Sequence, residues 1–106
     1  MSENPVKLSK TVRFGRWECN CYRTQYPVGG ATALYLVEKG TEEPIATATV
    51  NVPEANDSLG IGAVLIKDYG ENSGMMAALE EAGIAADTGR RVHTGFTEAK
   101  VARLLL

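Results

Sequence analysis

The stretch Ile45-Ala46-Thr47-Ala48-Thr49-Val50-Asn51-Val52 best indicates the fold class of this chain. From Ala46 onward, alanines and valines occupy every second position, with threonines and Asn51 between them. Successive side chains of a β-strand point to opposite faces of a sheet, so this period of two is typical of a strand with one buried face and one face in water. The stretch therefore predicts an antiparallel sheet and places Thr47, Thr49 and Asn51 on its solvent side.

Two strands are predicted upstream of this stretch. The first covers residues 11–21, and its apolar positions change phase at Gly15-Arg16. A one-residue slip exchanges the two faces of a strand, so a bulge or bend is expected there. Proline and glycines favour a turn over residues 26–30, and residues 32–37 are predicted to return as the second strand of a hairpin.

One helix is predicted near the middle of the second half. Its apolar side chains repeat at the helical spacing i, i+3, i+4, i+7, at Met75, Met76, Leu79 and Ala82. Asn72 or Ser73 is expected to cap the first turn, and Gly83 stands where a helix-ending glycine belongs. So short a helix needs a sheet to pack on.

The remaining segments complete the predicted order β-β-β-β-α-β-β. A loop over residues 53–60 and a short buried strand over 61–67 precede the helix, and a turn at Thr88-Gly89 follows it. Two last strands are predicted over 91–96 and 99–105. The predicted fold class is α+β, a mostly antiparallel sheet of five to six strands with one helix packed on a face.

The 106-residue chain has the composition of one globular domain, with 44% hydrophobic and 23% charged residues. No apolar run is long enough to span a bilayer, and the first residues show no signal-peptide pattern, so a cytoplasmic protein without membrane association is expected. Residues 1–10 lack periodicity and are predicted to be a flexible arm ahead of a single domain over residues 11–106.

The net charge of −2 is unevenly distributed along the chain. Residues 1–25 carry five basic and two acidic residues, residues 26–89 carry two basic and ten acidic, and residues 90–106 carry four basic and one acidic. If the two basic ends were neighbours in the sheet, they would form a basic strip suited to docking on a charged partner. The alternative is that opposite charges neutralise one another across the fold.

No catalytic motif is present, because the chain lacks a Walker loop, a dinucleotide-binding fingerprint, a G-x-S-x-G elbow and an H-E-x-x-H pair. A dyad of Cys19 or Cys21 with His93 is one interpretation, and two reduced, half-buried thiols that pack as small hydrophobic side chains is the favoured one. These three residues do not complete a four-ligand metal set. The sequence predicts a non-enzymatic protein without metal or cofactor, and it lacks a basic–aromatic stripe for nucleic acid.

The densest polar cluster is Lys67–Ser73, where a predicted strand ends and the predicted helix begins. Loops at such junctions often carry binding residues, although helix capping explains the same cluster and a general acid–base pair is a third interpretation. Two adjacent arginines can clamp an acidic group, although on a strand only one of them faces a given partner. The residues predicted to contact a protein partner are Asp68, Tyr69, Glu71, Asn72, Arg90 and Arg91.

Four stretches resemble an uncharacterised family of short bacterial and phage proteins, a domain of unknown function found on mobile genetic elements. They are residues 12–17, 48–53, 66–72 and the ending from Gly83-Ile84 to Gly95-Phe96. None of these stretches is a catalytic motif. The resemblance implies an accessory protein that interferes with host defence, such as an inhibitor of a CRISPR–Cas or restriction complex.

Taken with that resemblance, the sequence predicts a non-enzymatic protein that binds a host protein or nucleoprotein complex. The alternative is a small structural or regulatory module without a defence role, formed as a homodimer by pairing of edge strands.

Overall fold

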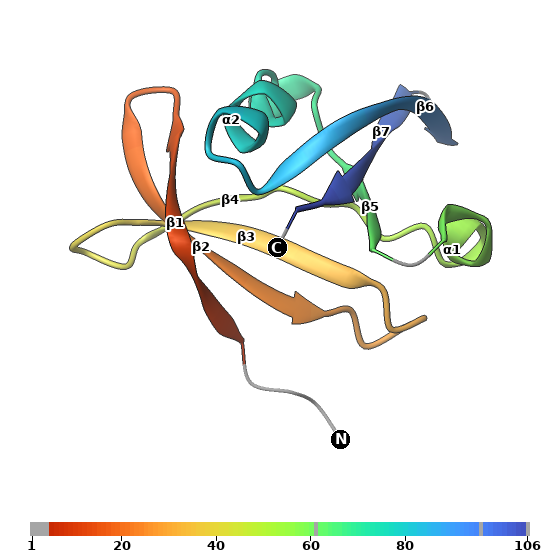
Figure 1. The fold of residues 1–106 in the computed structure, drawn as a ribbon, viewed down its shortest axis with the longest axis horizontal. Helices are drawn as coiled ribbons and strands as arrows, with labels where there is room; N and C mark the ends of the chain where they lie inside the picture. Colours follow the sequence, from red (N-terminus) through yellow and green to blue (C-terminus); the bar gives the residue numbers. More distant parts are fainter. Residues whose placement is uncertain (1–4, 61, 96, 106) are drawn as a thin grey trace.

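The computed structural model describes residues 5–60, 62–95 and 97–105, apart from the side chains of residues 56–58. Within these residues the chain forms seven strands, two α-helices and a single 3-10 turn (Figure 1). The elements are β1 (Val6–Phe14), β2 (Trp17–Gln25), β3 (Thr32–Glu38), β4 (Pro44–Thr47), α1 (Pro53–Leu59), β5 (Ala63–Ile66), η1 (Gly70–Asn72), α2 (Met75–Glu81), β6 (Ala85–Thr94) and β7 (Thr97–Leu104).

The strands form two antiparallel sheets, with the orders β1-β2-β3-β4 and β5-β7-β6. The chain is therefore an α+β protein with mostly antiparallel strands, as predicted. The predicted single sheet of five to six strands with one helix was wrong in its details. Gly15-Arg16 reverses the chain between β1 and β2 instead of bending one strand, and Gly15 has a φ of +60°, which glycine adopts without strain.

The second helix, α1, lies where a loop was predicted. Pro53 stands in its first turn, where its fixed φ suits a helix and its missing N–H costs nothing. The Ala55 N–H donates to the carbonyl oxygen of Val52 at 2.9 Å and closes the first turn. Both features are local, so the sequence carried a signal for this helix that the loop prediction overlooked.

Residues 48–50 join the two sheets, because they bond to β3 on one side and to β5 on the other. The Ala48 N–H donates to the Leu34 carbonyl at 2.8 Å, and the Val50 N–H donates to the Leu65 carbonyl at 3.0 Å. The Lys67 N–H donates back to the Ala48 carbonyl at 2.8 Å. One segment therefore leaves the first sheet and enters the second without a break in backbone pairing.

This crossing overturns the prediction that Thr49 lies on a solvent-exposed face. Its side chain is buried between the sheets. Its hydroxyl oxygen accepts the Leu34 N–H at 3.2 Å and shares a hydrogen bond with the Tyr26 hydroxyl at 2.8 Å. A polar group is stable in a core when its hydrogen bonds are satisfied, so the threonine acts here as an internal link.

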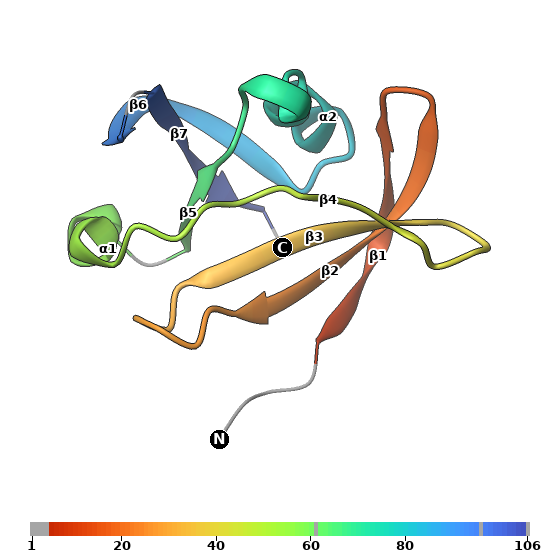
Figure 2. The same cartoon turned by 180° about the vertical axis from the view of Figure 1, so that it is seen from behind.

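Helix α2 lies between the outer strands of the two sheets. β1 ends the first sheet, β6 ends the second, and α2 packs against both (Figure 1 and Figure 2). The predicted apolar stripe is confirmed, since Met75, Met76 and Leu79 are buried and Glu80 and Glu81 are exposed.

The main core draws on both sheets and on α2. Its buried members are Val12, Phe14, Cys19, Cys21, Leu34, Leu36, Ala48, Val64, Ile66, Met75, Met76, Leu79, Ile84, Ala85 and Ala102. A smaller cluster around Leu65, Ala99 and Val101 lies on the other face of the second sheet, where Leu59 of α1 packs against it.

The predicted C-terminal glycine of α2 is confirmed. Gly83 has a φ of +77°, and its N–H donates to the Glu80 carbonyl at 3.0 Å. The Ile84 N–H donates to the Leu79 carbonyl, also at 3.0 Å, which completes the two bonds of a Schellman motif. The buried Ile84 side chain anchors the exit of the helix in the core.

Two boundaries differ from the prediction. β1 begins at Val6, which pairs with Arg23, so residues 6–10 belong to a strand, whereas residues 1–4 of the predicted arm lie outside the described residues. Thr88-Gly89 is a bulge within β6 instead of a turn, because the register with β7 shifts between Asp87 and Arg91.

Candidate functional surfaces

Asp68, one of the predicted site residues, forms the start of α2. Its carboxylate accepts the N–H groups of Gly74 and Met75 at 2.6 and 3.0 Å, and its other oxygen lies 2.6 Å from Nζ of Lys100. The side chain is only 9% exposed. Burial alone would raise the pKa of Asp68, but the hydrogen bonds from Lys100 and from the two backbone amides outweigh it and lower that pKa. The expected capping by Asn72 or Ser73 is therefore performed by Asp68.

Arg91 lies beside this ion pair on the same face of the second sheet. It is the cross-strand partner of Lys100, and it forms two contacts with Asp87, at 3.0 and 3.3 Å. The Gly89 N–H, the neighbouring Arg91 and Lys100 all lower the pKa of Asp87 against the opposing effect of burial. Two predicted site residues, Asp68 and Arg91, thus belong to two ion pairs, Asp68–Lys100 and Arg91–Asp87, whose cations are cross-strand neighbours.

The other predicted residues of the β5–α2 connection have structural partners. Glu71 lies 2.9 Å from Nζ of Lys67, and this contact lowers the pKa of Glu71. The same ammonium lies 5.8 Å from the centre of the Tyr69 ring. Asn72 is buried, and its amide donates to the Thr47 carbonyl at 2.7 Å, which ties the connection to β4. Asn72 is therefore not available to a partner, contrary to the prediction.

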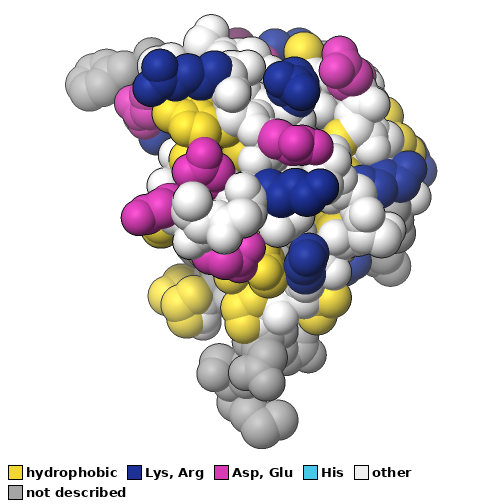
Figure 3. Space-filling model, turned by 90° about the vertical axis from the view of Figure 1, so that its left-hand side faces the viewer, with side chains coloured by type: hydrophobic (Ala, Val, Ile, Leu, Met, Phe, Trp, Pro, Cys, Tyr) yellow, Lys and Arg dark blue, Asp and Glu magenta, His cyan; other side chains and the backbone are white. Residues whose placement is uncertain are grey.

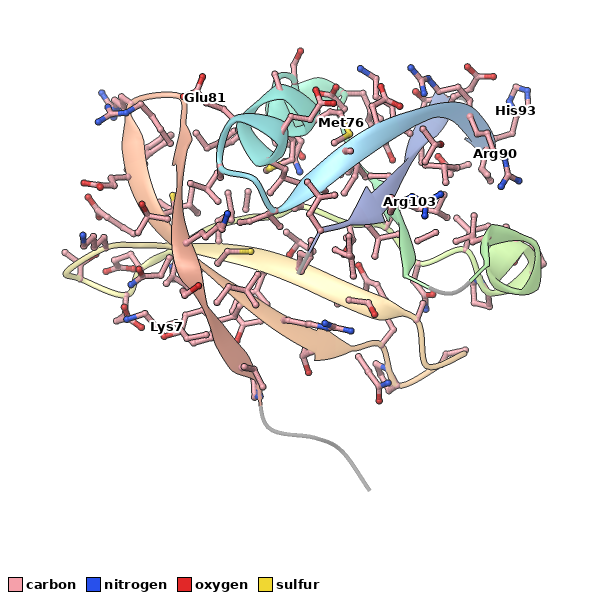
Figure 4. All side chains as sticks on the ribbon, in the orientation of Figure 1. Lys7, Met76, Glu81, Arg90, His93 and Arg103 are labelled. Carbon is pink, nitrogen blue, oxygen red and sulfur yellow. The ribbon has the colours of Figure 1, made fainter. Side chains whose placement is uncertain are left out.

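Arg90 lies apart from Arg91, as their adjacent strand positions predicted. It lines a cavity of about 150 Å³ with Arg103 on the face of the second sheet that carries the smaller core cluster. Figure 4 shows both arginines on the side of that sheet nearest α1. The sequence singled out Arg90 but not Arg103, because the strand register that places them together was unknown.

The cysteines lie on β2 in the main core, fully buried and not half-buried as predicted. Burial raises the pKa of the Cys19 thiol, and it raises the pKa of Cys21 to about 12. His93 is exposed on β6 and lies 3.5 Å from Glu98. Both thiols are therefore protonated at neutral pH, and no three His, Cys, Asp or Glu side chains within the described part of the chain are grouped as a metal site.

The β1–β2 hairpin carries an unbalanced positive charge. Among the described residues, no carboxylate lies within 4.0 Å of its five basic side chains, Lys7, Lys10, Arg13, Arg16 and Arg23. The acid of this hairpin, Glu18, lies 4.0 Å from Lys39 instead. Figure 3 views the molecule from the side of the hairpin and shows basic side chains interspersed with acidic ones.

These cations were counted in the sequence, and the condition under which the two basic ends would form one strip is not met. β1 pairs only with β2, whereas β7 lies between β5 and β6 in the other sheet. The terminal segments are therefore not neighbouring strands, and no continuous basic strip forms by strand pairing. The hairpin and the arginine cavity are two separate basic regions.

A groove runs between the hairpin and the outer side of α2. Its two adjoining parts have volumes of about 300 and 160 Å³, and both are lined by Arg13, Ala78 and Glu81. Figure 4 shows Glu81 between the hairpin tip and α2. The groove is open because the helix presents alanines there, and no sequence pattern marked it.

Comparison with known proteins gives no match to a protein-family model, to a curated protein or to a solved structure. Among the described residues, no helix has the length and apolar character needed to cross a membrane.

Proposed function

We propose that this protein is a non-enzymatic accessory protein of a phage or other mobile element, which binds a host defence complex and occludes it. The observation that carries the binding mode is the β1–β2 hairpin, whose basic side chains have no carboxylate neighbour among the described residues. The mobile-element setting comes from the family resemblance.

The perturbed ionisable groups favour binding over catalysis. A general acid or base works best when its pKa lies near the working pH. Here the pKa values of Asp68, Glu71 and Asp87 are lowered, and that of Cys21 is raised to about 12. Each of these shifts moves the group further from neutrality, which stabilises a fixed charge or a protonated thiol.

The hairpin suits an acidic surface on the partner. A cation already paired within its own chain must give up that contact to bind an external carboxylate, whereas an unpaired cation gives up only water. Lys7, Arg13 and Arg23 have no ion pair with any residue that the structure describes, and all three are exposed. Charges of this sort accelerate association and orient the encounter, and salt weakens both effects.

Binding to purified CRISPR effector and restriction complexes tests the proposal, with Arg13→Glu as the main variant. Arg13 lies on the hairpin and lines the groove beside α2. We expect the variant to weaken binding by about tenfold or more, mainly through slower association. The matched control is Lys67→Glu, which makes the same change in net charge at the exposed pair with Glu71.

Three outcomes would count against the proposal. Absence of binding to every complex would remove the host-defence function. Equal weakening by Lys67→Glu would show that net charge, and not the hairpin, governs binding. Equally tight binding to naked nucleic acid would show that the hairpin recognises phosphates in general.

A further inference from the structure

The cavity between Arg90 and Arg103 exists because the neighbours of Arg103 are small. In the second sheet Arg103 pairs with Ala63 of β5 on one side and with Ala86 of β6 on the other. Directly opposed residues of antiparallel strands point to the same face, so the long arginine stands between two methyl groups. The space that larger side chains would fill stays open, with a volume of about 150 Å³.

The bulge in β6 holds Arg90 at the other side of this cavity. The Thr88 hydroxyl donates to the Val101 carbonyl at 2.7 Å and accepts the Arg90 N–H at 3.2 Å. The Gly89 N–H is bound by the Asp87 carboxylate at 2.9 Å. Bulges fixed in this way redirect a side chain out of the regular alternation, and this one sets Arg90 in the wall of the cavity that Arg103 lines.

The lining has two chemical halves. Leu59, Ala63 and Val101 form an apolar part, and the other lining residues that the structure describes are Thr88 and the two arginines, none of them acidic. Arg103 has no ion pair with any described residue. Arg90 already makes an interaction within the chain, so Arg103 is the cation on which recognition depends.

We propose that this cavity binds a small organic anion, with its oxyanion at Arg103 and its short hydrocarbon part against Leu59, Ala63 and Val101. Arginine pairs with carboxylates and phosphates through two parallel hydrogen bonds, which makes these the fitting head groups. The cavity is smaller than the roughly 300–1,000 Å³ of typical ligand pockets, so the hydrocarbon part is limited to a few carbon atoms. This site is separate from the hairpin, and it does not depend on the proposed host partner.

Titration followed by amide NMR shifts tests the site, using butyrate, butyl phosphate, inorganic phosphate and n-butanol. We expect butyrate or butyl phosphate to shift the amides of Ala63, Thr88 and Val101 and to bind more tightly than inorganic phosphate. The tighter-binding of the two organic anions identifies the preferred head group.

Arg103→Gln should weaken the binding of that anion by about tenfold, as expected for loss of a charge-assisted contact. Arg103→Lys should weaken it less, because the charge remains while the two-pronged geometry is lost.

Arg23→Gln is the matched control, since it removes another exposed arginine, on β2, that has no ion pair with a described residue. Its affinity for the anion should equal that of the unmodified protein. The proposal fails if none of the anions shifts these amides at tens of millimolar, if n-butanol shifts them as strongly, or if Arg23→Gln and Arg103→Gln weaken binding equally. An unchanged amide spectrum elsewhere in Arg103→Gln shows that the variant is folded.

Discussion

At the scale of single residues, Asp68 joins three parts of the molecule. Its carboxylate binds the first amides of α2 and the ammonium of Lys100 on β7, and it lies two residues after the end of β5 in the chain. A carboxylate at a helix N-terminus also interacts favourably with the partial positive charge of the first turn. The residue was predicted as a partner contact, but its 9% exposure and its bonds assign it to the fold.

Replacing Asp68 with Asn should destabilise the protein by about 1–3 kcal/mol at pH 7, because it removes the ion pair and weakens the helix cap. The folded-state pKa of Asp68 lies below its usual value, so its contribution is fully present above the unfolded pKa of about 3.9 and is lost as the pH falls through the folded value. Urea unfolding of the parent and of Asp68→Asn at pH 7 and near pH 3 measures this contribution of Asp68 to the free energy of unfolding.

The gap in unfolding free energy between the parent and Asp68→Asn should therefore shrink on acidification. Glu43→Gln is the control, since Glu43 is an exposed acid in the β3–β4 turn and its replacement should change stability by less than about 0.5 kcal/mol. A gap that stays constant from pH 7 to pH 3 would show that the charge of Asp68 is unimportant.

At the scale of elements, the end of α2 shows how a local rule fixes a boundary. Gly83 has a φ of +77°, where a side chain is strained. A Cβ built at this position would lie 2.8 Å from Nζ of Lys10, whose side chain reaches from β1 to the end of the helix. An ammonium group there faces the partial negative charge of the helix C-terminus.

Gly83→Ala should cost about 1–2 kcal/mol of stability, and backbone strain should account for most of it because the flexible Lys10 side chain can move aside. The same substitution in a Lys10→Ala background separates the two causes. We expect its cost there to differ by no more than about 0.5 kcal/mol, measured by urea unfolding of all four proteins. If the cost disappeared without Lys10, the contact and not the backbone would be its source.

Elements determined by neighbouring residues in the sequence could be predicted, whereas elements determined by contacts between distant residues could not. The α2 stripe and Gly83 follow from helical spacing and a C-terminal glycine, so they were found. The cap was assigned to the nearest polar residues, whereas Asp68 reaches Gly74 across six positions. Thr88-Gly89 has the composition of a turn, and only its pairing with β7 makes it a bulge.

The same limit applies to the candidate sites. Arg90 was identified because it stands next to another arginine, but Arg103 could be joined to it only through the register of β6, β7 and β5. The charge count found the basic N-terminal segment, although the sequence could not show that its cations have no carboxylate neighbour among the described residues. Thr49 was predicted on a solvent-exposed face because an alternating pattern assumes that the segment lies in one sheet. Residues 48–50 instead pair with strands of both sheets.

At the scale of the whole molecule, the two sheets share one core and one crossing segment. Residues of both sheets and of α2 meet in the main cluster. Domains of about this size with a single core usually unfold in one cooperative step. The crossing at residues 48–50 should therefore couple the stability of the first sheet to that of the second.

Thr49→Val tests this coupling, because it keeps the side-chain shape and removes the oxygen that accepts the Leu34 N–H. A buried donor left without a partner costs about 1–3 kcal/mol. We expect two probes to report the same loss of unfolding free energy: the fluorescence of Trp17 in β2 and slow amide exchange in β7. Thr47→Val, on the exposed side of β4, should leave both unchanged to within about 0.5 kcal/mol.

The two probes report on different sheets, so a loss of stability seen by Trp17 and absent from β7 would mean that the sheets open independently. Equal losses would identify the buried hydroxyl as part of a single folding unit, because a hydrogen bond to β3 can lower the protection of β7 only if both sheets unfold together.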